Sequence, residues 1–309
     1  MRRATFLLPP LAALLLLTAC GSEQAGTPGA GAAASASGAA VTTRPVDGVR
    51  ITSVTIPSGT PASSPGSDGY SVHADPLPTG DSGISAAYEV TNDGAEAMTF
   101  SVLFDFTTDA GEVMGNRQET VRSVGPGATV RGTVRLGVSA PGASRVTRVS
   151  VARVTKVPAA EAPPASGECP PSGIRVSADD GDAAMGLRVV ELHLENCGKQ
   201  DYSLDGYPLL ELLDGDLSPV EGVRIVHGSG GISTGTGFDE PARPLVLKPG
   251  ESAVSGLMWR NTTGSGTPVD VPYVKVRAER GADPVTVTPH LDLGTTGKLA
   301  VRAWSRPSE

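Results

Sequence analysis

Residues 84–106, ISAAYEVTNDGAEAMTFSVLFDF, decide the fold class of this chain. Two series of apolar residues, each occupying every second position, flank a turn motif; they are Ile84, Ala86, Tyr88 and Val90, and then Met98, Phe100, Val102, Phe104 and Phe106. Alternation with a period of two is typical of a strand with one buried face. Asn92, Asp93 and Gly94 favour a turn between the two series. The stretch therefore predicts two strands that face the same core.

The sequence around this stretch repeats the pattern. Further strands are expected at residues 48–56, 118–124, 129–136 and 146–157, with turn residues such as Gly125, Pro126 and Gly127 between them. No window shows an apolar period of three to four, so helices are not expected. A dense series of short strands separated by turns predicts an immunoglobulin-like β-sandwich over residues 46–157.

The second half of the chain follows the same rules. Residues 158–167 are rich in Ala, Pro and Glu and read as a short, stiff linker. Beyond it, Val190, Leu192 and Leu194 alternate with three polar residues, and more strands are expected at residues 202–213, 245–247, 253–259, 271–278, 285–288 and 299–304. We therefore expect a second antiparallel sandwich over residues 168–309, and an all-β protein with two tandem immunoglobulin-like domains.

The two halves share a skeleton. An Asn-x-Gly turn follows an alternating strand at Asn92 and again at Asn196, and a Pro-Gly pair precedes a later strand at Pro126 and at Pro249. The second copy is longer between these marks, and the extra residues fall in the Gly/Ser/Thr-rich segment 222–240. The halves read as two divergent copies of one sandwich type.

The first twenty residues form a secretion signal. Arg2 and Arg3 precede an apolar run over residues 6–17, which is shorter than the ~20 residues that a membrane-spanning helix needs. The run ends in Leu17-Thr18-Ala19-Cys20, which resembles the lipobox of bacterial lipoproteins. The resemblance implies removal of residues 1–19, acylation of Cys20, and anchoring on the extracytoplasmic face of the cell membrane. The alternative is an ordinary signal peptide with a chance cysteine.

Residues 21–45 contain almost no large apolar side chain and are expected to form a flexible tether behind the lipidated cysteine. With Cys20 acylated, Cys169 and Cys197 remain as an even pair in an oxidising compartment. We expect these two to form a disulfide; two free thiols are the alternative.

Several motifs of the second half occur in the order known from a family. They are Cys169, Asn196-Cys197-Gly198, Gly206-Tyr207-Pro208 and Lys248-Pro249-Gly250-Glu251-Ser252-Ala253. Over residues 168–304 the chain resembles a β-sandwich domain of unknown function that is common in actinobacterial lipoproteins and secreted proteins. The later cysteine that is frequent in that family is missing here. The resemblance implies no catalytic residues.

Charge narrows the choice of partners. The formal net charge is −8, which argues against nucleic acid as a partner. The first half nevertheless concentrates basic residues after position 116, among them Arg131, Arg135, Arg148 and Arg153. They could form a basic face for an anionic envelope polymer, or they could pair with acidic residues on neighbouring strands.

Two constellations suggest chemistry. Ser233 lies in Gly231-Ile232-Ser233-Thr234-Gly235, which fits G-x-S-x-G, with Asp239 or Asp270 and His290 as conceivable partners. A serine hydrolase would need a strand before Ser233 and a helix after it, and no helix is expected. We therefore keep catalysis as an alternative only.

The second constellation contains residue types that bind metal ions. Glu191, His193 and Glu195 share the outer face of one strand, but neighbouring positions on one face are ~6.8 Å apart, which suits a solvated face better than a metal site. The acidic motifs at residues 179–182 and 214–216 read as turns, and His73, His227 and His290 have no nearby Cys or His in the sequence. Trp259 is expected to point inward.

These observations predict a non-catalytic lipoprotein without a cofactor, held at the membrane by its N-terminal lipid. Its role would be binding or envelope interaction with a polymer or protein partner. Loops on a rigid sandwich usually carry recognition, so we expect contact through residues 222–240 or a sheet edge.

Overall fold

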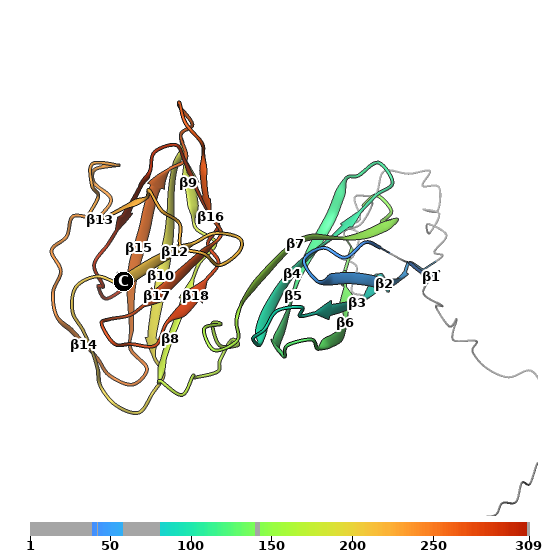
Figure 1. Ribbon diagram of the computed structural model, residues 1–309, viewed down its shortest axis with the longest axis horizontal. Helices are drawn as coiled ribbons and strands as arrows, with labels where there is room; N and C mark the ends of the chain where they lie inside the picture. Colours follow the sequence, from blue (N-terminus) through green and yellow to red (C-terminus); the bar gives the residue numbers. More distant parts are fainter. Residues whose placement is uncertain (1–38, 42, 58–80, 140–142, 308–309) are drawn as a thin grey trace, which may run out of the picture. The chain divides into compact units, whose positions relative to one another are not determined.

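The structure is a computed structural model that describes residues 39–41, 43–57, 81–139 and 143–307. These ranges contain twenty β-strands and no helix, so the predicted all-β fold is confirmed (Figure 1). Accordingly, no helix in this part of the chain is long and apolar enough to cross a membrane. The predicted signal segment 1–19, Cys20 and His73 lie outside the described residues.

The N-terminal strands form two antiparallel sheets. One sheet has the order β1-β2-β3-β6, with β1 Ala39–Ala40, β2 Val49–Thr55, β3 Ser85–Thr91 and β6 Thr129–Arg135. The other has the order β5-β4-β7, with β4 Met98–Thr107, β5 Val113–Val124 and β7 Arg148–Pro158. β1 pairs with Ser53 and Val54 of β2 and lies inside segment 21–45, which the sequence assigned to the tether.

The alternating residues of the opening stretch fill the core between these sheets. Every second side chain of β3 is buried, and on β4 the rings of Phe100, Phe104 and Phe106 are at most 2% exposed. The Tyr88 ring lies 4.9 Å from that of Phe104, measured between centroids. Burial of these aromatic rings supplies much of the hydrophobic stabilisation of this half.

The C-terminal half is organised on a larger sheet. Its order is β13-β20-β15-β10-β8, and β9 pairs with β10; the bounds are β8 Ile174–Ala178, β9 Asp182–Ala184, β10 Leu187–Asn196, β13 Arg224–His227, β15 Ser252–Arg260 and β20 Lys298–Val301. Three smaller sheets accompany it. They are β12-β17-β18, with β12 Leu209–Leu213, β17 Tyr273–Arg277 and β18 Val285–Val287; β11-β14, with β11 Tyr202–Leu204 and β14 Leu245–Leu247; and β16-β19, with β16 Val269–Val271 and β19 Leu291–Gly294.

One hydrophobic cluster joins these sheets. Leu192, Leu194, Leu257 and Leu293 are fully buried in it, and Trp259, at 3% exposure, points inward as expected. Trp304 is 2% exposed and donates its indole N–H to the carbonyl of Ala278 at 2.9 Å. Both tryptophans of the chain therefore report on this core.

One strand pair departs from the expected antiparallel arrangement. β13 runs parallel to β20, with Arg224 opposite Lys298 and His227 opposite Val301. β13 lies in segment 222–240, which the sequence suggested to be a loop. Four residues without a clear alternation gave no strand signal, and the pairing partner is far away in the sequence.

An asparagine fixes the same corner in both halves. The Asn196 side chain, 1% exposed, donates to the carbonyls of Gln200 and Leu247 at 2.8 Å each and accepts from the backbone N–H of Gly198 at 3.1 Å. Its own backbone carbonyl accepts from the N–H of Gly250 at 2.7 Å. We call this arrangement the asparagine corner.

The N-terminal copy has the same corner. Asn92 donates to the carbonyls of Glu96 at 2.7 Å and Val124 at 2.8 Å, and it accepts from Gly94 at 3.0 Å. Its backbone carbonyl accepts from the N–H of Gly127 at 2.8 Å. The shared motifs in the sequence thus correspond to equivalent hydrogen bonds.

The predicted disulfide is present. Cys169 and Cys197 are joined with a Cα–Cα distance of 5.7 Å. The bond ties the segment before β8 to the turn after β10, next to the asparagine corner. Close by, the backbone N–H of Gly198 donates to the carbonyl of Gly173 at 2.9 Å.

The predicted linker is bonded to the sandwich that follows it. The Glu161 carboxylate accepts from the Thr286 hydroxyl at 2.7 Å and lies 3.1 Å from the Lys275 ammonium. The backbone N–H of Thr286 donates to the carbonyl of Glu161 at 2.8 Å. The linker is therefore fixed by hydrogen bonds and an ion pair to the C-terminal half, in addition to the stiffness of its prolines.

Asp292 makes the stability of the C-terminal core sensitive to acid. Burial raises the pKa of this carboxyl, but hydrogen bonds from Asn261, Trp259 and Arg188 together outweigh that effect and lower it. A lowered folded pKa contributes stability above the unfolded pKa of about 3.9, and this stability is lost as the pH falls through the folded value. The side chain is 47% exposed, so we expect Asp292→Asn to cost only about 1 kcal/mol at pH 7.

The measurement is urea unfolding at pH 7 and at pH 3, with Asp283→Asn as the control. We expect the deficit of Asp292→Asn to shrink at pH 3. An equal deficit at both pH values would contradict the role of the ionised carboxylate.

Candidate functional site: a charged groove on the outer sheet face

The candidate site lies on the outer face of the six-stranded sheet. On β10, Val190, Leu192 and Leu194 face the core, so the alternate residues Glu191, His193 and Glu195 face outward. Pairing puts Ser177 of β8 and Val254 of β15 on either side of His193. The strand alternation therefore places three ionisable side chains in a row between two neighbouring strands.

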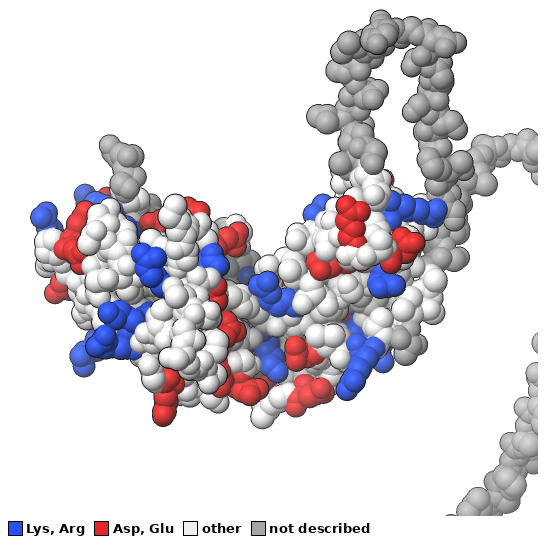
Figure 2. Space-filling model, turned by 90° about the horizontal axis from the view of Figure 1, so that it is seen from above, with Lys and Arg blue, Asp and Glu red and all other residues white. Residues whose placement is uncertain are grey.

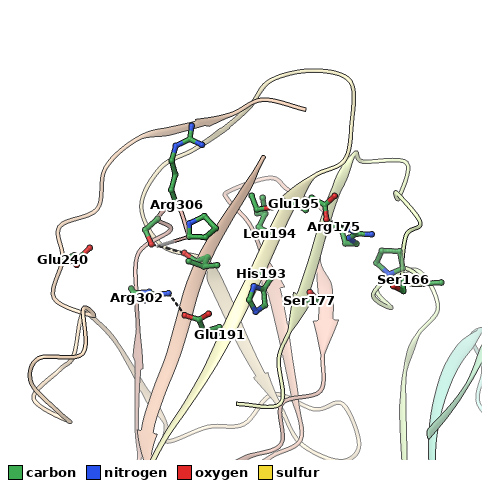
Figure 3. A pocket seen from close by; sticks show the side chains of 16 residues that line it. Ser166, Arg175, Ser177, Glu191, His193, Leu194, Glu195, Glu240, Arg302 and Arg306 are labelled. Atoms are coloured by element: carbon green, nitrogen blue, oxygen red, sulfur yellow. Dashed lines mark hydrogen bonds and ion pairs between the residues drawn. The ribbon is translucent and has the colours of Figure 1, made fainter. Parts of the chain in front are cut away.

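These residues line a groove of about 850 Å³, the outer groove, to which β8, β10, β15 and the segment after β20 contribute. Figure 3 shows His193 between two pairs of opposite charge on this face. The Arg175 guanidinium contacts the Glu195 carboxylate, and Arg302 donates to Glu191 at 3.0 Å. The His193 imidazole forms no hydrogen bond with any other residue that the structure describes.

Arg302 connects the groove to a small second core. Its guanidinium carbon lies 5.9 Å from the ring centroid of Phe238, within cation–π range. Phe238 is 2% exposed and packs with Met258 and Ala300, which are fully buried on the outer face of the sheet. Residues 228–240 thus fold over the sheet, and we call them the covering loop.

The covering loop is packed against the sheet, although its Gly/Ser/Thr-rich composition gave no sign of a core. The Asp239 carboxylate accepts from the backbone N–H of Ser229 at 2.8 Å, and this bond lowers the pKa of Asp239. Phe238 and Ile232 are the large apolar residues of a Gly/Ser-rich segment, and both belong to the small core. Two large apolar side chains in an otherwise Gly/Ser-rich segment were the only sequence feature that could have predicted this packing.

Gly256 makes room for Phe238. A Cβ added at this position of β15 would lie 2.9 Å from the Cζ atom of the ring. Because Met258 and Ala300 hold the ring, we expect Gly256→Ala to cost about 1–3 kcal/mol and to loosen the covering loop. Limited proteolysis should then cleave within residues 228–240 faster than in the wild type. Gly215→Ala is the matched control, since nothing lies within 4 Å of a Cβ there; equal cleavage rates in both variants would contradict the steric role.

Ser233 lacks the surroundings of a nucleophile elbow. It follows β13 in a run of bends and turns, and no helix succeeds it. Asp239 bonds Ser229 instead, and among the described residues no hydrogen bond joins Ser233 to Asp270 or His290. Burial, followed by the charge of Arg153, lowers the pKa of His290, which lies just before β19.

The acidic motifs behave differently from each other. Asp214 accepts from the N–H groups of Asp216 and Ser218 at 2.9 Å each, as expected of a turn. Asp179 also caps its turn, but in addition its ligand atom lies within 4.8 Å of those of Glu191 and His193. Sequence reasoning missed this grouping because Asp179 comes from outside β10.

The basic residues of the first half do not form one face. Arg131 pairs with Glu89 across β6 and β3 at 2.9 Å, and Arg50 approaches the same carboxylate at 2.5 Å. These hydrogen bonds, with that from Arg50 the stronger, lower the pKa of Glu89. Arg135 is on β6, whereas Arg148 and Arg153 are on β7 of the other sheet. Figure 2 shows basic and acidic side chains interspersed on the face that it displays.

His227, the remaining histidine of the described chain, stacks on Tyr207 with ring centroids 3.9 Å apart. Tyr207 belongs to the Gly-Tyr-Pro motif. Stacking accounts for the position of His227. Among the described residues, it does not group with other potential metal ligands.

The half of the chain that holds the groove matches a known protein family. Residues 169–305 match the model of a family described as "Domain of unknown function (DUF4232)". No curated protein matches the chain. The matched range includes the disulfide, the asparagine corner at Asn196 and most of the outer groove. The C-terminal half of this chain therefore carries a domain of unknown function, as the resemblance in its motifs predicted.

Proposed function

We propose that this protein is a non-catalytic lipoprotein of the cell envelope, anchored through Cys20 on the extracytoplasmic face of the membrane. Its signal segment, its lipobox and its resemblance to actinobacterial lipoproteins support the anchor. The outer groove supports the binding role. The tether over residues 21–45 would lift two tandem immunoglobulin-like sandwiches, 46–157 and 168–309, off the membrane.

The arrangement of charges in the groove carries the proposal. Arg175 and Arg302 each pair with a glutamate inside a concave surface, and the four side chains are still 19–41% exposed, so each pair contributes only on the order of 1 kcal/mol. A ligand that presents both a carboxylate and an amine can therefore exchange partners with these pairs at little cost. Peptide-bearing envelope polymers and protein surfaces have this chemistry.

The anchor is tested by the intact mass of the protein extracted from membranes of cells that produce it. We expect residues 20–309 plus acyl chains, and release of the protein into the medium when Cys20 is replaced by serine. A soluble, unacylated mass for the native protein would refute the anchor.

The groove is tested by co-sedimentation of the protein with isolated cell walls. We expect Arg302→Gln and Arg175→Gln to reduce the bound fraction, and Arg277→Gln, which alters an exposed arginine of β17, to leave it unchanged. Binding should also fall with added salt. If the groove variants sediment like the wild type, or if the wild type does not sediment, the groove does not bind the wall.

A further inference from the structure

We propose that Asp179, Glu191 and His193 form a binding site for a divalent transition-metal ion of the zinc class. One ligand atom from each of the three residues lies within 4.8 Å of the other two. Zinc ligands at about 2.0–2.2 Å in tetrahedral geometry are about 3.4 Å apart, so small side-chain rotations bring the three atoms onto one ion. Glu191 and His193 belong to β10, and Asp179 directly follows β8.

Asp179 supplies a third ligand that the outward-facing residues of β10 cannot provide by themselves. Outward positions on one strand are about 6.8 Å apart, which is too wide for that row alone to surround an ion. The backbone N–H of Asp179 donates to the carbonyl of Glu191 at 3.1 Å, so the neighbouring chain is held against β10 at this level. The Oδ1 atom of Asp179 accepts from the N–H groups of Glu191 at 2.8 Å and Gly181 at 3.1 Å, which fixes the carboxylate and leaves Oδ2 for an ion.

Arg302 orients the second carboxylate. It donates to the Oε1 atom of Glu191 at 3.0 Å, so Oε2 is the oxygen available for an ion. Hydrogen bonds of this kind to ligating carboxylates position them in metal sites. Arg302 also offsets part of the negative charge that Asp179 and Glu191 bring together.

The donor set decides the class of ion. One imidazole nitrogen and two carboxylate oxygens suit zinc and its first-row neighbours, with copper binding more tightly by the general order of affinity. Calcium takes six to eight oxygen ligands, and this cluster does not offer them. Three protein ligands leave a coordination position open toward the outer groove, where His193 and Glu191 form part of the lining.

The test uses the full chain without a polyhistidine tag and titrates it calorimetrically with ZnCl₂ and with CaCl₂. We expect one zinc ion per chain and no calcium binding. Asp179→Asn, which keeps the Oδ1 hydrogen bonds, and His193→Gln should each weaken zinc binding by about tenfold or more. Glu195→Gln is the matched control, since it removes the next outward carboxylate, which pairs with Arg175.

A second readout identifies the ligands directly. Electron paramagnetic resonance of the Cu²⁺ form should show coupling to one nitrogen, and this coupling should vanish in His193→Gln. Binding should weaken as the pH falls, because protons compete for the imidazole and the carboxylates. Absence of zinc binding, calcium binding as tight as zinc binding, or a Glu195→Gln effect equal to that of His193→Gln would overturn the site. Because the ion alone is the probe, this result does not depend on whether cell walls bind the groove.

Discussion

Replacing Asn196 with alanine will lower the free energy of unfolding of the C-terminal sandwich by about 2–4 kcal/mol, because the buried carbonyl of Leu247 and the part-buried carbonyl of Gln200 lose their donor. Leu247 and Gln200 each lose a hydrogen bond of 2.8 Å, and the N–H of Gly198 keeps only its bond to the Gly173 carbonyl. Water cannot easily replace the side chain, since Asn196 is only 1% exposed. Asn196→Asp should cost at least as much, because an isosteric carboxylate has no N–H to donate.

Urea unfolding followed by tryptophan fluorescence measures this effect. The chain has two tryptophans, Trp259 and Trp304, and both lie in the C-terminal core. Asn92→Ala removes the equivalent hydrogen bonds from the N-terminal sandwich and should shift the tryptophan transition far less. An Asn196→Ala midpoint within error of the wild type would show that the corner does not hold this sandwich.

Loss of the disulfide will destabilise the same sandwich by about 3–4 kcal/mol. The bond spans 28 residues, and in the chain-entropy model a closed loop of this length restricts the unfolded chain by that amount. The loop contains β8, β9 and β10, which form one side of the large sheet and carry Glu191 and His193. Cys169 is exposed, so a reductant should reach the bond without unfolding the protein.

The experiment compares urea transitions of the oxidised protein, the reduced protein and the Cys169→Ser/Cys197→Ser double variant. With a typical urea slope of about 1–3 kcal/mol per M for a small domain, the midpoint should fall by about 1–4 M. Circular dichroism, which also reports on the N-terminal sheets, should show a second transition that reduction leaves in place. A reduced protein as stable as the oxidised one would mean that the native contacts around Gly173 and Gly198 alone close this end of the sandwich.

Local alternation was enough to predict the central strands. β3 and β4 begin within one residue of the expected positions. Each strand buries one face in the core, so apolar residues occupy every second position of its sequence. β5 was predicted only from residue 118 but begins at Val113, because this edge strand is largely solvated and its sequence carries little alternation. The disulfide and the shared Asn-x-Gly turns could be predicted because cysteines and turn residues have specific structural roles that depend little on the rest of the chain.

The sequence could not reveal features that depend on distant parts of the chain. The parallel pairing of Arg224 with Lys298 and the packing of Phe238 on Gly256 join residues that are far apart or chemically unremarkable. From the spacing along β10, the sequence predicted a solvated face for Glu191, His193 and Glu195 together. That spacing could not include Asp179, which approaches from the end of β8 only after the strands pair.

The place of β20 has a consequence for how the protein matures. Residues 298–301 come late in the chain, yet they form an interior strand between β13 and β15. A polypeptide leaves the ribosome or an export channel with its N-terminus first, so β13 and β15 emerge well before the strand that joins them. Until then β13 lacks its partner, Phe238 lacks Ala300, and Glu191 lacks Arg302. The groove therefore forms only after residues 298–302 have emerged and paired, and a nascent chain that lacks them has no groove with which to engage a ligand.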